Sequence, residues 1–154
     1  MGAPASEPQA VVEVRRTFAA TPEQVFDAWT NPAMMAKWLC RVPTGPEVKV
    51  QIVELRPGGR LQLEALEPTG VVWKLRSEYR EVERPKRLVF TWKWDGHDEK
   101  GESLVTVEFH RLGSSNFTEV ILRHTGLPNA KECADHRQGW TECLEQLEKV
   151  MAQV

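Results

Sequence analysis

Histidine, cysteine and tyrosine are the residue types of this sequence that could support chemistry, and they are few. The chain has four histidines, three cysteines and one tyrosine. No two histidines have the HExxH spacing of a helical zinc site, no serine lies in a GxSxG elbow, and no glycine-rich loop opens a helix. The sequence therefore predicts no metal site, no cofactor and no catalytic residue, and we favour a protein that is not an enzyme.

Two of the histidines could still belong to a functional site. His136, on the predicted last helix, could act as a general base if a carboxylate oriented its ring inside a dry cavity. The alternative, which we favour, is a helix histidine that only makes hydrogen bonds at the edge of such a cavity. His124, on a predicted strand, has the same two interpretations, and we again favour the structural one.

Cys143 and Tyr79 are the other candidates. Cys143 could be a nucleophile, but no basic partner is evident at helical spacing, so we favour a buried and inert thiol. Tyr79 could orient a ligand through its hydroxyl, or it could simply pack on the inner face of a sheet. Cys133 and Cys143 would stand about 15 Å apart along one helix, too far for a disulfide. Three cysteines without a disulfide framework favour a reducing, cytoplasmic location.

Two short helices are expected near the start of the chain. Thr21 is a helix cap, Pro22 takes the first helical position, and Gln24 completes a capping box. Asn31, which precedes a proline, is expected to end this helix and to cap the second one. Their apolar faces would carry Val25, Phe26 and Trp29 in the first helix, and Met34, Met35, Trp38 and Leu39 in the second.

From residue 46 to residue 125 the hydrophobic pattern has a period of two. Six segments there, together with residues 11–18, alternate apolar and polar side chains, and short turn-forming sequences separate them. Because a parallel crossover needs about a dozen residues or more, we predict a seven-stranded, largely antiparallel sheet. Its inner face should carry Leu61, Leu63, Ala65, Trp73, Leu75, Tyr79, Leu88, Phe90, Trp92, Trp94, Val105, Val107, Phe109, Val120, Leu122 and His124.

A long amphipathic helix is predicted from the Asn129 cap to about Met151. An interior glycine, Gly139, costs such a helix about 1 kcal/mol relative to alanine. We expect the glycine to let the helix backbone approach the sheet or a short helix closely. The apolar stripe would consist of Cys133, His136, Trp140, Cys143, Leu147 and Val150, and the opposite face of Lys131, Asp135, Glu142, Gln146 and Lys149.

Composition excludes several classes of protein. The 154 residues have a net charge of −2 with interspersed signs, so no basic stripe is present and nucleic-acid binding is disfavoured. No apolar run approaches the roughly 20 residues of a membrane span. Residues 1–9 are small, polar and proline-rich, and we expect a disordered tail followed by a single domain over residues 10–154.

A twisted antiparallel sheet of this length should curl around the last helix. Large aromatic rings on a curved sheet are hard to pack completely, so we favour a residual cavity over the alternative of a solid core. Residues expected on its walls are candidates for binding a ligand. They are Trp38, Trp73, Leu75, Tyr79, Phe90, Trp92, Val107, Phe109, Leu122, His124, His136, Trp140 and Cys143.

Five segments together resemble one known family. They are "ATPEQVFDAWTNPAMMAKWL", "VELRPGGRLQLE", "REVERPKRLVFTWKW", "TEVILRHTGLPN" and "HRQGWTECLEQLEKV". In this order they are similar to the START-like (SRPBCC) superfamily, and within it to homologues of the C-terminal domain of the activator of heat-shock-chaperone ATPase, the AHSA-like family. The resemblance covers about residues 10 to 152. It implies an α+β helix-grip fold, in which a curved antiparallel sheet wraps around the long C-terminal helix with a mostly apolar cavity between them.

The resemblance leaves three functions open. The first, which we favour, is a carrier, sensor or stress-related protein that binds a small hydrophobic or aromatic molecule in the cavity. The second is a co-chaperone that interacts with a heat-shock chaperone, although the resemblance covers only the C-terminal domain of that activator. The third is a cavity enzyme of the cyclase, dehydratase or hydrolase type found in the superfamily.

Overall fold

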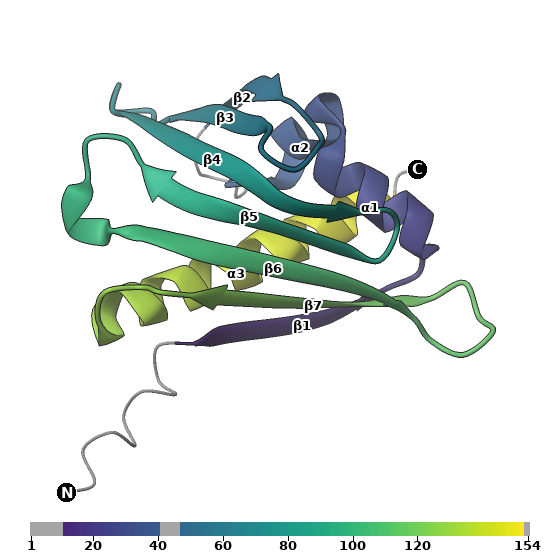
Figure 1. Cartoon of the computed structure of the whole chain (residues 1–154). Coiled ribbons are helices and arrows are strands. Elements are labelled where there is room, and N and C mark those ends of the chain that lie inside the picture. Colours follow the sequence, from purple (N-terminus) through teal and green to yellow (C-terminus); the bar gives the residue numbers. More distant parts are fainter. Residues whose placement is uncertain (1–10, 41–46, 153–154) are drawn as a thin grey trace, which may run out of the picture.

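One antiparallel sheet dominates the structure, a computed structural model that describes residues 11–40 and 47–152 (Figure 1). Its strands are β1 (Val12–Phe18), β2 (Glu47–Val53), β3 (Arg60–Leu66), β4 (Val72–Glu83), β5 (Arg87–Trp94), β6 (Glu102–Arg111) and β7 (Thr118–Thr125). They lie in the order β1-β7-β6-β5-β4-β3-β2, and every neighbouring pair is antiparallel. The predicted sheet is confirmed. The predicted tail, residues 1–9, lies outside the described residues.

In the described part of the chain, three α-helices accompany the sheet, and the predicted caps form. They are α1 (Pro22–Thr30), α2 (Pro32–Trp38) and α3 (Ala130–Met151), and a short 3-10 turn, η2 (Asp98–Lys100), lies between β5 and β6. Thr21 Oγ1 accepts a hydrogen bond from the Gln24 backbone N–H at 3.2 Å, and the Gln24 side chain accepts one from the Thr21 N–H at 2.9 Å. Asn31 caps α2 and Asn129 caps α3, each through its side-chain oxygen.

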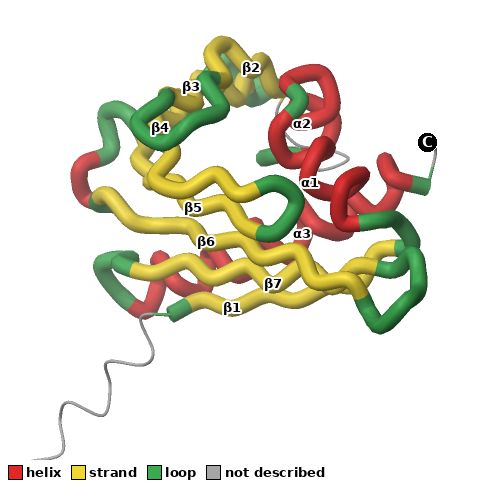
Figure 2. Tube along the Cα trace, turned by 45° about the vertical axis from the view of Figure 1, so that its right-hand side comes forward, coloured by secondary structure: helices red, strands yellow, loops and turns green. Residues whose placement is uncertain are grey.

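The helices lie on one side of the curved sheet. Figure 2 shows α3 running behind β5, β6 and β7, while α1 and α2 lie together near one end of the sheet. Trp38 Nε1 donates a hydrogen bond to the Ala28 carbonyl oxygen at 2.9 Å and thereby joins the two short helices. This arrangement is the predicted α+β helix-grip fold.

The space between sheet and α3 is largely filled by side chains. The inner face of the sheet and the α3 residues Trp140, Cys143, Leu144 and Leu147 form one buried cluster. Cys133, at the other end of the predicted stripe, instead packs with Val12 and Leu127 in a smaller cluster. The predicted apolar stripe of the last helix is therefore buried except at His136, which is partly exposed, and its buried members contribute to two clusters.

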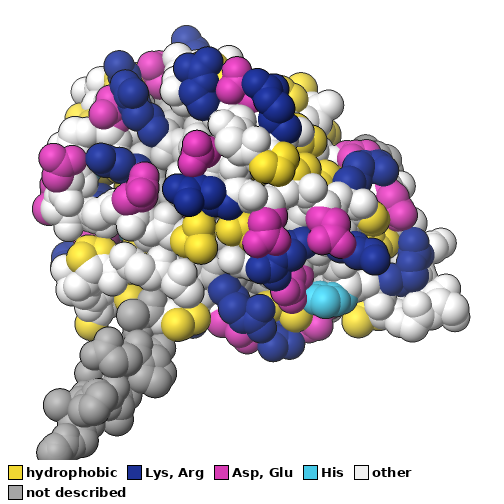
Figure 3. Space-filling model, in the orientation of Figure 1, with side chains coloured by type: hydrophobic (Ala, Val, Ile, Leu, Met, Phe, Trp, Pro, Cys, Tyr) yellow, Lys and Arg dark blue, Asp and Glu magenta, His cyan; other side chains and the backbone are white. Residues whose placement is uncertain are grey.

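The outer face of the sheet is charged and of mixed sign. Figure 3 shows basic and acidic side chains interspersed over it. Arg87 pairs with both Glu81 and Glu108, and Arg123 pairs with Glu13 and approaches Glu108. Such exposed pairs each contribute at most about 1 kcal/mol to stability. In residues 11–40 and 47–152, no helix is both long and apolar enough to cross a membrane.

Candidate functional site

All six tryptophans of the sequence lie in one continuous series of ring contacts. The series begins between α1 and α2, crosses α3 and ends on β5 and β4, so it leads from the core towards the surface. In order it consists of Trp38, Trp29, Trp140, Trp92, Trp94 and Trp73, with successive ring centroids 4.6, 6.0, 4.9, 5.6 and 5.7 Å apart. Offset and edge-to-face contacts of this kind stabilise a fold beyond simple burial.

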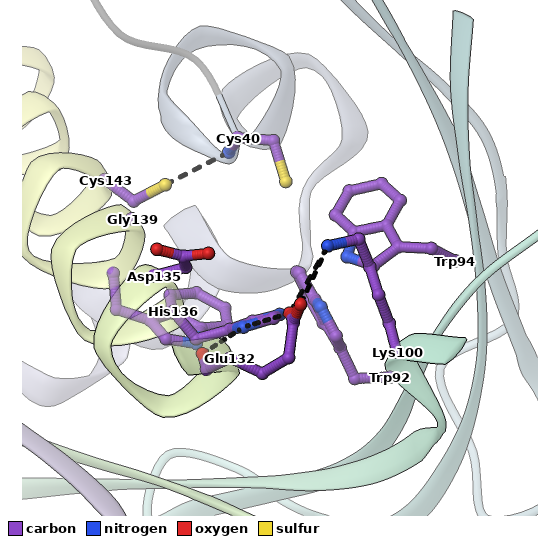
Figure 4. A pocket seen from close by; sticks show the side chains of 10 residues that line it. Cys40, Trp92, Trp94, Lys100, Glu132, Asp135, His136, Gly139 and Cys143 are labelled. Carbon is purple, nitrogen blue, oxygen red and sulfur yellow. Dashed lines mark hydrogen bonds and ion pairs between the residues drawn. The ribbon is translucent and has the colours of Figure 1, made fainter. Parts of the chain in front are cut away.

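A pocket of about 200 Å³ opens beside the middle of this series (Figure 4). It lies between α3, the end of β5, the turn η2 and the second residue after α2, Cys40. Three indole rings form its aromatic walls, and polar side chains gather on another side. The lining residues are Cys40, Trp92, Trp94, Lys100, Glu132, Asp135, His136, Gly139, Trp140 and Cys143.

Gly139 contributes to this pocket by having no side chain. A Cβ atom built at this position would meet no atom within 4 Å outside its own stretch of helix, so the helix does not approach a neighbouring element closely there. The predicted close approach is therefore wrong. Since Gly139 lines the pocket, a side chain at this position would project into the open space beside Trp140. The glycine keeps the pocket open at a cost of about 1 kcal/mol in helix stability.

A buried hydrogen-bond chain fixes the wall formed by Trp140. The indole Nε1–H of Trp140 donates to His124 Nδ1 at 2.9 Å, so this nitrogen carries no proton. The proton is then on Nε2, which donates to Ser103 Oγ at 2.6 Å, and the Ser103 hydroxyl donates to the Trp92 carbonyl oxygen at 3.3 Å. Burial, and secondarily the nearby His136, lower the pKa of His124 to about 3, in agreement with a neutral ring.

The polar side of the pocket is built by α3 and η2. Lys100 Nζ lies 3.1 and 3.3 Å from the two carboxylate oxygens of Glu132. Glu132 is only 7% exposed. His136, one turn further along α3, donates from Nδ1 to the Glu132 backbone oxygen at 2.8 Å, while its distance to the Glu132 carboxylate is 3.6 Å. The buried carboxylate is thus compensated chiefly by the lysine, as burial of a charge requires.

Asp135 corrects the predicted helix faces. The helical pattern predicts Asp135 on the face opposite the apolar stripe, but the residue lines the rim of the pocket. The physical reason is Gly139, which stands one turn further along α3. Because Gly139 has no side chain to cover the helix backbone, the pocket extends around the helix as far as Asp135. Asp135 remains exposed, and a 2.8 Å hydrogen bond from Lys131 lowers the pKa of its carboxyl.

Two cysteines meet at the remaining side of the pocket. The backbone N–H of Cys40 donates to Cys143 Sγ at 3.2 Å, which joins the end of α2 to α3. Burial raises the pKa of the Cys40 thiol well above its usual value, and the neighbouring Cys143 adds to the effect. A thiol with a raised pKa is a poor nucleophile at neutral pH.

The predicted candidates divide between the pocket and the core. Trp92, His136, Trp140 and Cys143 line the pocket, and His124 lies behind Trp140. Trp73 is half-buried, donates Nε1–H to the Glu67 carboxylate at 2.6 Å and stacks on His97. The remaining candidates are buried within the core cluster and do not line the pocket: Trp38, Leu75, Tyr79, Phe90, Val107, Phe109 and Leu122.

Six lining residues were absent from the predicted candidates: Cys40, Trp94, Lys100, Glu132, Asp135 and Gly139. Helical spacing alone could have indicated Glu132 and Gly139, because they stand four residues before and three residues after His136. Lys100 offered no such signal, since it comes from a polar turn whose path over the pocket depends on the whole hairpin.

Comparisons with known proteins agree with the fold and the family. The family described as Activator of Hsp90 ATPase homolog 1-like protein matches residues 19–152. Among solved structures, a protein from Chromobacterium violaceum is similar with 26% identity and a TM-score of 0.82, over 92% of this chain and 96% of that one. The AHSA1 protein from Silicibacter pomeroyi has 26% identity and a TM-score of 0.80, over 94% and 99% of the two chains.

A solved structure of lower sequence identity also has the same fold. A protein from Arthrobacter aurescens has 21% identity and a TM-score of 0.83, over 96% of this chain and 88% of that one. The comparison with curated proteins gives no match. Because the match over residues 19–152 spans most of the sequence, the chain belongs to the Activator of Hsp90 ATPase homolog 1-like family of the START-like (SRPBCC) superfamily.

Proposed function

We propose that this protein binds a small aromatic or apolar molecule in the pocket between β5 and α3. The observation that carries the proposal is the pocket itself, which has three indole walls and a glycine where the helix would otherwise fill it. Hydrophobic ligands are common in this fold. Concave, mostly apolar sites with a few placed polar groups are the usual form of small-molecule sites.

The size of the pocket limits the ligand. A dry apolar cavity of about 150 Å³ holds benzene in another protein. The 200 Å³ available here therefore suits a ligand of one ring or two fused rings. Longer lipids or sterols would need the packed core to open, which would separate fully buried residues such as Trp38, Leu75 and Leu122.

Binding is better supported than catalysis by the polar groups of the pocket. A general base of the usual kind would have its imidazole oriented by a carboxylate. The ring of His136 is instead oriented by a backbone oxygen, and Glu132 is engaged by Lys100.

A co-chaperone role would depend on the protein surface rather than on the pocket, and it would appear as a changed ATPase rate of a heat-shock chaperone on addition of this protein.

A cytoplasmic location is part of the proposal. Cys40, Cys133 and Cys143 are present as thiols, the state that a reducing compartment maintains.

Quenching of tryptophan fluorescence by 4-bromotoluene tests the proposal, because a bound bromine atom quenches indoles next to it. Saturable quenching is expected for the wild-type protein. Gly139→Leu should abolish it by filling the pocket, whereas Ala134→Leu, at an exposed position of the same helix, should leave it unchanged. Equal saturable quenching in the Gly139→Leu variant would place the ligand elsewhere, and an absence of saturable quenching in the wild type would contradict ligand binding of this class.

A further inference from the structure

Within the described residues, the polar side of the pocket has a hydrogen-bonding atom without a partner, Nε2 of His136, and the buried indole Nε1–H of Trp92 on the aromatic wall has no partner either. His136 is largely buried, with 12% of its side chain exposed, and it lines the pocket. Its Nδ1 lies 2.8 Å from the Glu132 backbone oxygen. Since a carbonyl oxygen can only accept, Nδ1 carries the proton, and in the neutral imidazole Nε2 is then an acceptor. Nε2 has no hydrogen-bond partner in residues 11–40 and 47–152.

The position of the His136 ring is also set by its surroundings. The ring lies edge-to-face with His124, with centroids 5.0 Å apart, and His124 is held by Trp140 and Ser103. The hydrogen bond to Glu132 and the ring contact with His124 therefore restrict the direction in which Nε2 can face. A fixed acceptor on a mostly aromatic wall is the kind of group that orients a ligand.

The charges that line the pocket do not favour an anionic ligand. Lys100, the one lysine or arginine that the described residues contribute to the lining, is already paired with Glu132. Asp135 at the rim adds a second carboxylate. A ligand carboxylate would therefore meet two negative groups and, among the described lining residues, no cation that is not already engaged. A buried ammonium group would likewise have to displace Lys100 in order to pair with Glu132.

We infer that the ligand is an uncharged aromatic molecule of one or two rings that carries a hydroxyl or N–H group, with this donor bound by His136 Nε2. The inference rests on the proposed function and deepens it. The ring of the ligand lies among the indoles of Trp92, Trp94 and Trp140, and the open space at Gly139 receives its edge. His136 acts as a specificity-determining residue, because an unmatched donor or acceptor in a buried site discriminates strongly between otherwise similar ligands.

Calorimetric titrations at pH 7 with three compounds of similar shape show whether the pocket prefers a hydrogen-bond donor, a ligand without one or an anion. 4-Bromophenol offers a donor, 4-bromoanisole has the donor replaced by a methyl ether, and 4-bromobenzoate is an anion. The wild-type protein should bind 4-bromophenol about tenfold more tightly than 4-bromoanisole, the preference expected from one hydrogen bond. The affinity for 4-bromobenzoate should be the lowest of the three.

Substitutions at His136 assign the preference to this residue. His136→Phe should reduce the difference between 4-bromophenol and 4-bromoanisole to less than about twofold, because the ring remains and the acceptor is lost. His136→Gln, whose amide oxygen can accept, should keep part of the preference and serves if the phenylalanine variant does not fold. His110→Phe, at a position with an exposed side chain, should behave like the wild type.

Each remaining outcome overturns a defined part of the account. Equal affinity of the wild type for 4-bromophenol and 4-bromoanisole would overturn the role of His136, yet it would leave the proposed function intact because the rings still bind. Tightest binding of 4-bromobenzoate would overturn the inference that the ligand is uncharged. Failure of all three compounds to bind would contradict the proposed function itself.

Discussion

The Trp140 indole donates its Nε1–H to His124 Nδ1 at 2.9 Å, and this bond joins α3 to β7, the strand next to the edge strand β1. Both residues are buried, with exposed fractions of 3% and 0%. One ring of the pocket wall is thereby held by a histidine that has to be neutral in order to accept the bond. His124 is a positioning residue that acts on the pocket through Trp140, and this relationship makes the stability of the protein dependent on pH.

Stability should fall as the pH is lowered below the ordinary histidine range. The pKa of His124 is about 3 in the folded protein and about 6.5 when unfolded, so between these values the unfolded chain binds the extra proton. The stability that His124 contributes is complete above pH 6.5 and is lost as the pH falls towards 3. For this one group, the free energy of unfolding should decrease by about 2 kcal/mol between pH 7 and pH 5.

Urea unfolding at a series of pH values measures this slope. His124→Gln has no group at this position that titrates in the range, so the variant should have a shallower slope than the wild type, whatever its absolute stability. The difference isolates His124, because the other histidines and the carboxylates are common to both proteins. Identical slopes in the two proteins would contradict the assignment of a neutral, buried His124.

Gly139→Ala should stabilise the fold and weaken ligand binding at the same time. Alanine is favoured over an interior helix glycine by about 1 kcal/mol, and no neighbouring atom obstructs the new methyl group. The same methyl group occupies space in the pocket, so the affinity for 4-bromophenol should fall about tenfold. Ala134→Gly is the matched control, since it should lose about 1 kcal/mol of stability and leave the affinity unchanged. Unchanged affinity in Gly139→Ala would show that the ligand does not reach this part of the helix.

Gly59, in contrast, has no room for a side chain. A Cβ atom at this position would lie 1.9 Å from the Glu54 backbone oxygen, in the turn between β2 and β3. Backbone would have to move, so Gly59→Ala should destabilise the protein by at least about 3 kcal/mol. Denaturant unfolding provides the measurement, and a loss below about 1 kcal/mol would mean that this turn adapts freely.

Tyr79→Phe should leave the stability unchanged or raise it by up to about 1 kcal/mol. The Tyr79 hydroxyl is buried and has no hydrogen-bond partner within the described part of the chain, and burial raises the pKa of the phenol. Phenylalanine keeps the edge-to-face contact with Phe90 and removes the desolvated hydroxyl. A loss of more than about 1 kcal/mol on thermal or urea unfolding would instead reveal a partner for the hydroxyl, such as a buried water.

Much of the fold could be predicted because helix caps and strand alternation depend only on residues close together in the sequence. The caps at Thr21, Asn31 and Asn129 depend on residues within one helical turn, and all three form. Strand alternation assigned the inner face of the sheet correctly, because a side chain in a strand has only two faces to choose from. These two kinds of pattern, with short connections, are sufficient for the sequential order of β2 to β7 and for the helix that crosses them. They do not predict the place of β1, which pairs with β7 from the other end of the chain.

The site could be predicted only in part, because facing the interior is not the same as lining a pocket. Leu75 and Phe90 face inward as predicted, but neighbouring side chains fill the space above them. The polar members depend on long-range geometry, since Lys100 reaches Glu132 across 32 residues of sequence. Gly139 was recognised as unusual, yet its role was misassigned, because sequence cannot distinguish a glycine that permits contact from one that preserves empty space.

Anomalous diffraction from crystals of the protein soaked with 4-bromophenol tests the central claim most directly, because bromine marks the position of the ligand without reference to the surrounding chain. The account predicts a bromine peak in the pocket between β5 and α3, next to Gly139 and between the rings of Trp92 and Trp140. A bromine peak only on the outer face of the sheet, or an empty pocket at saturating 4-bromophenol, would contradict it.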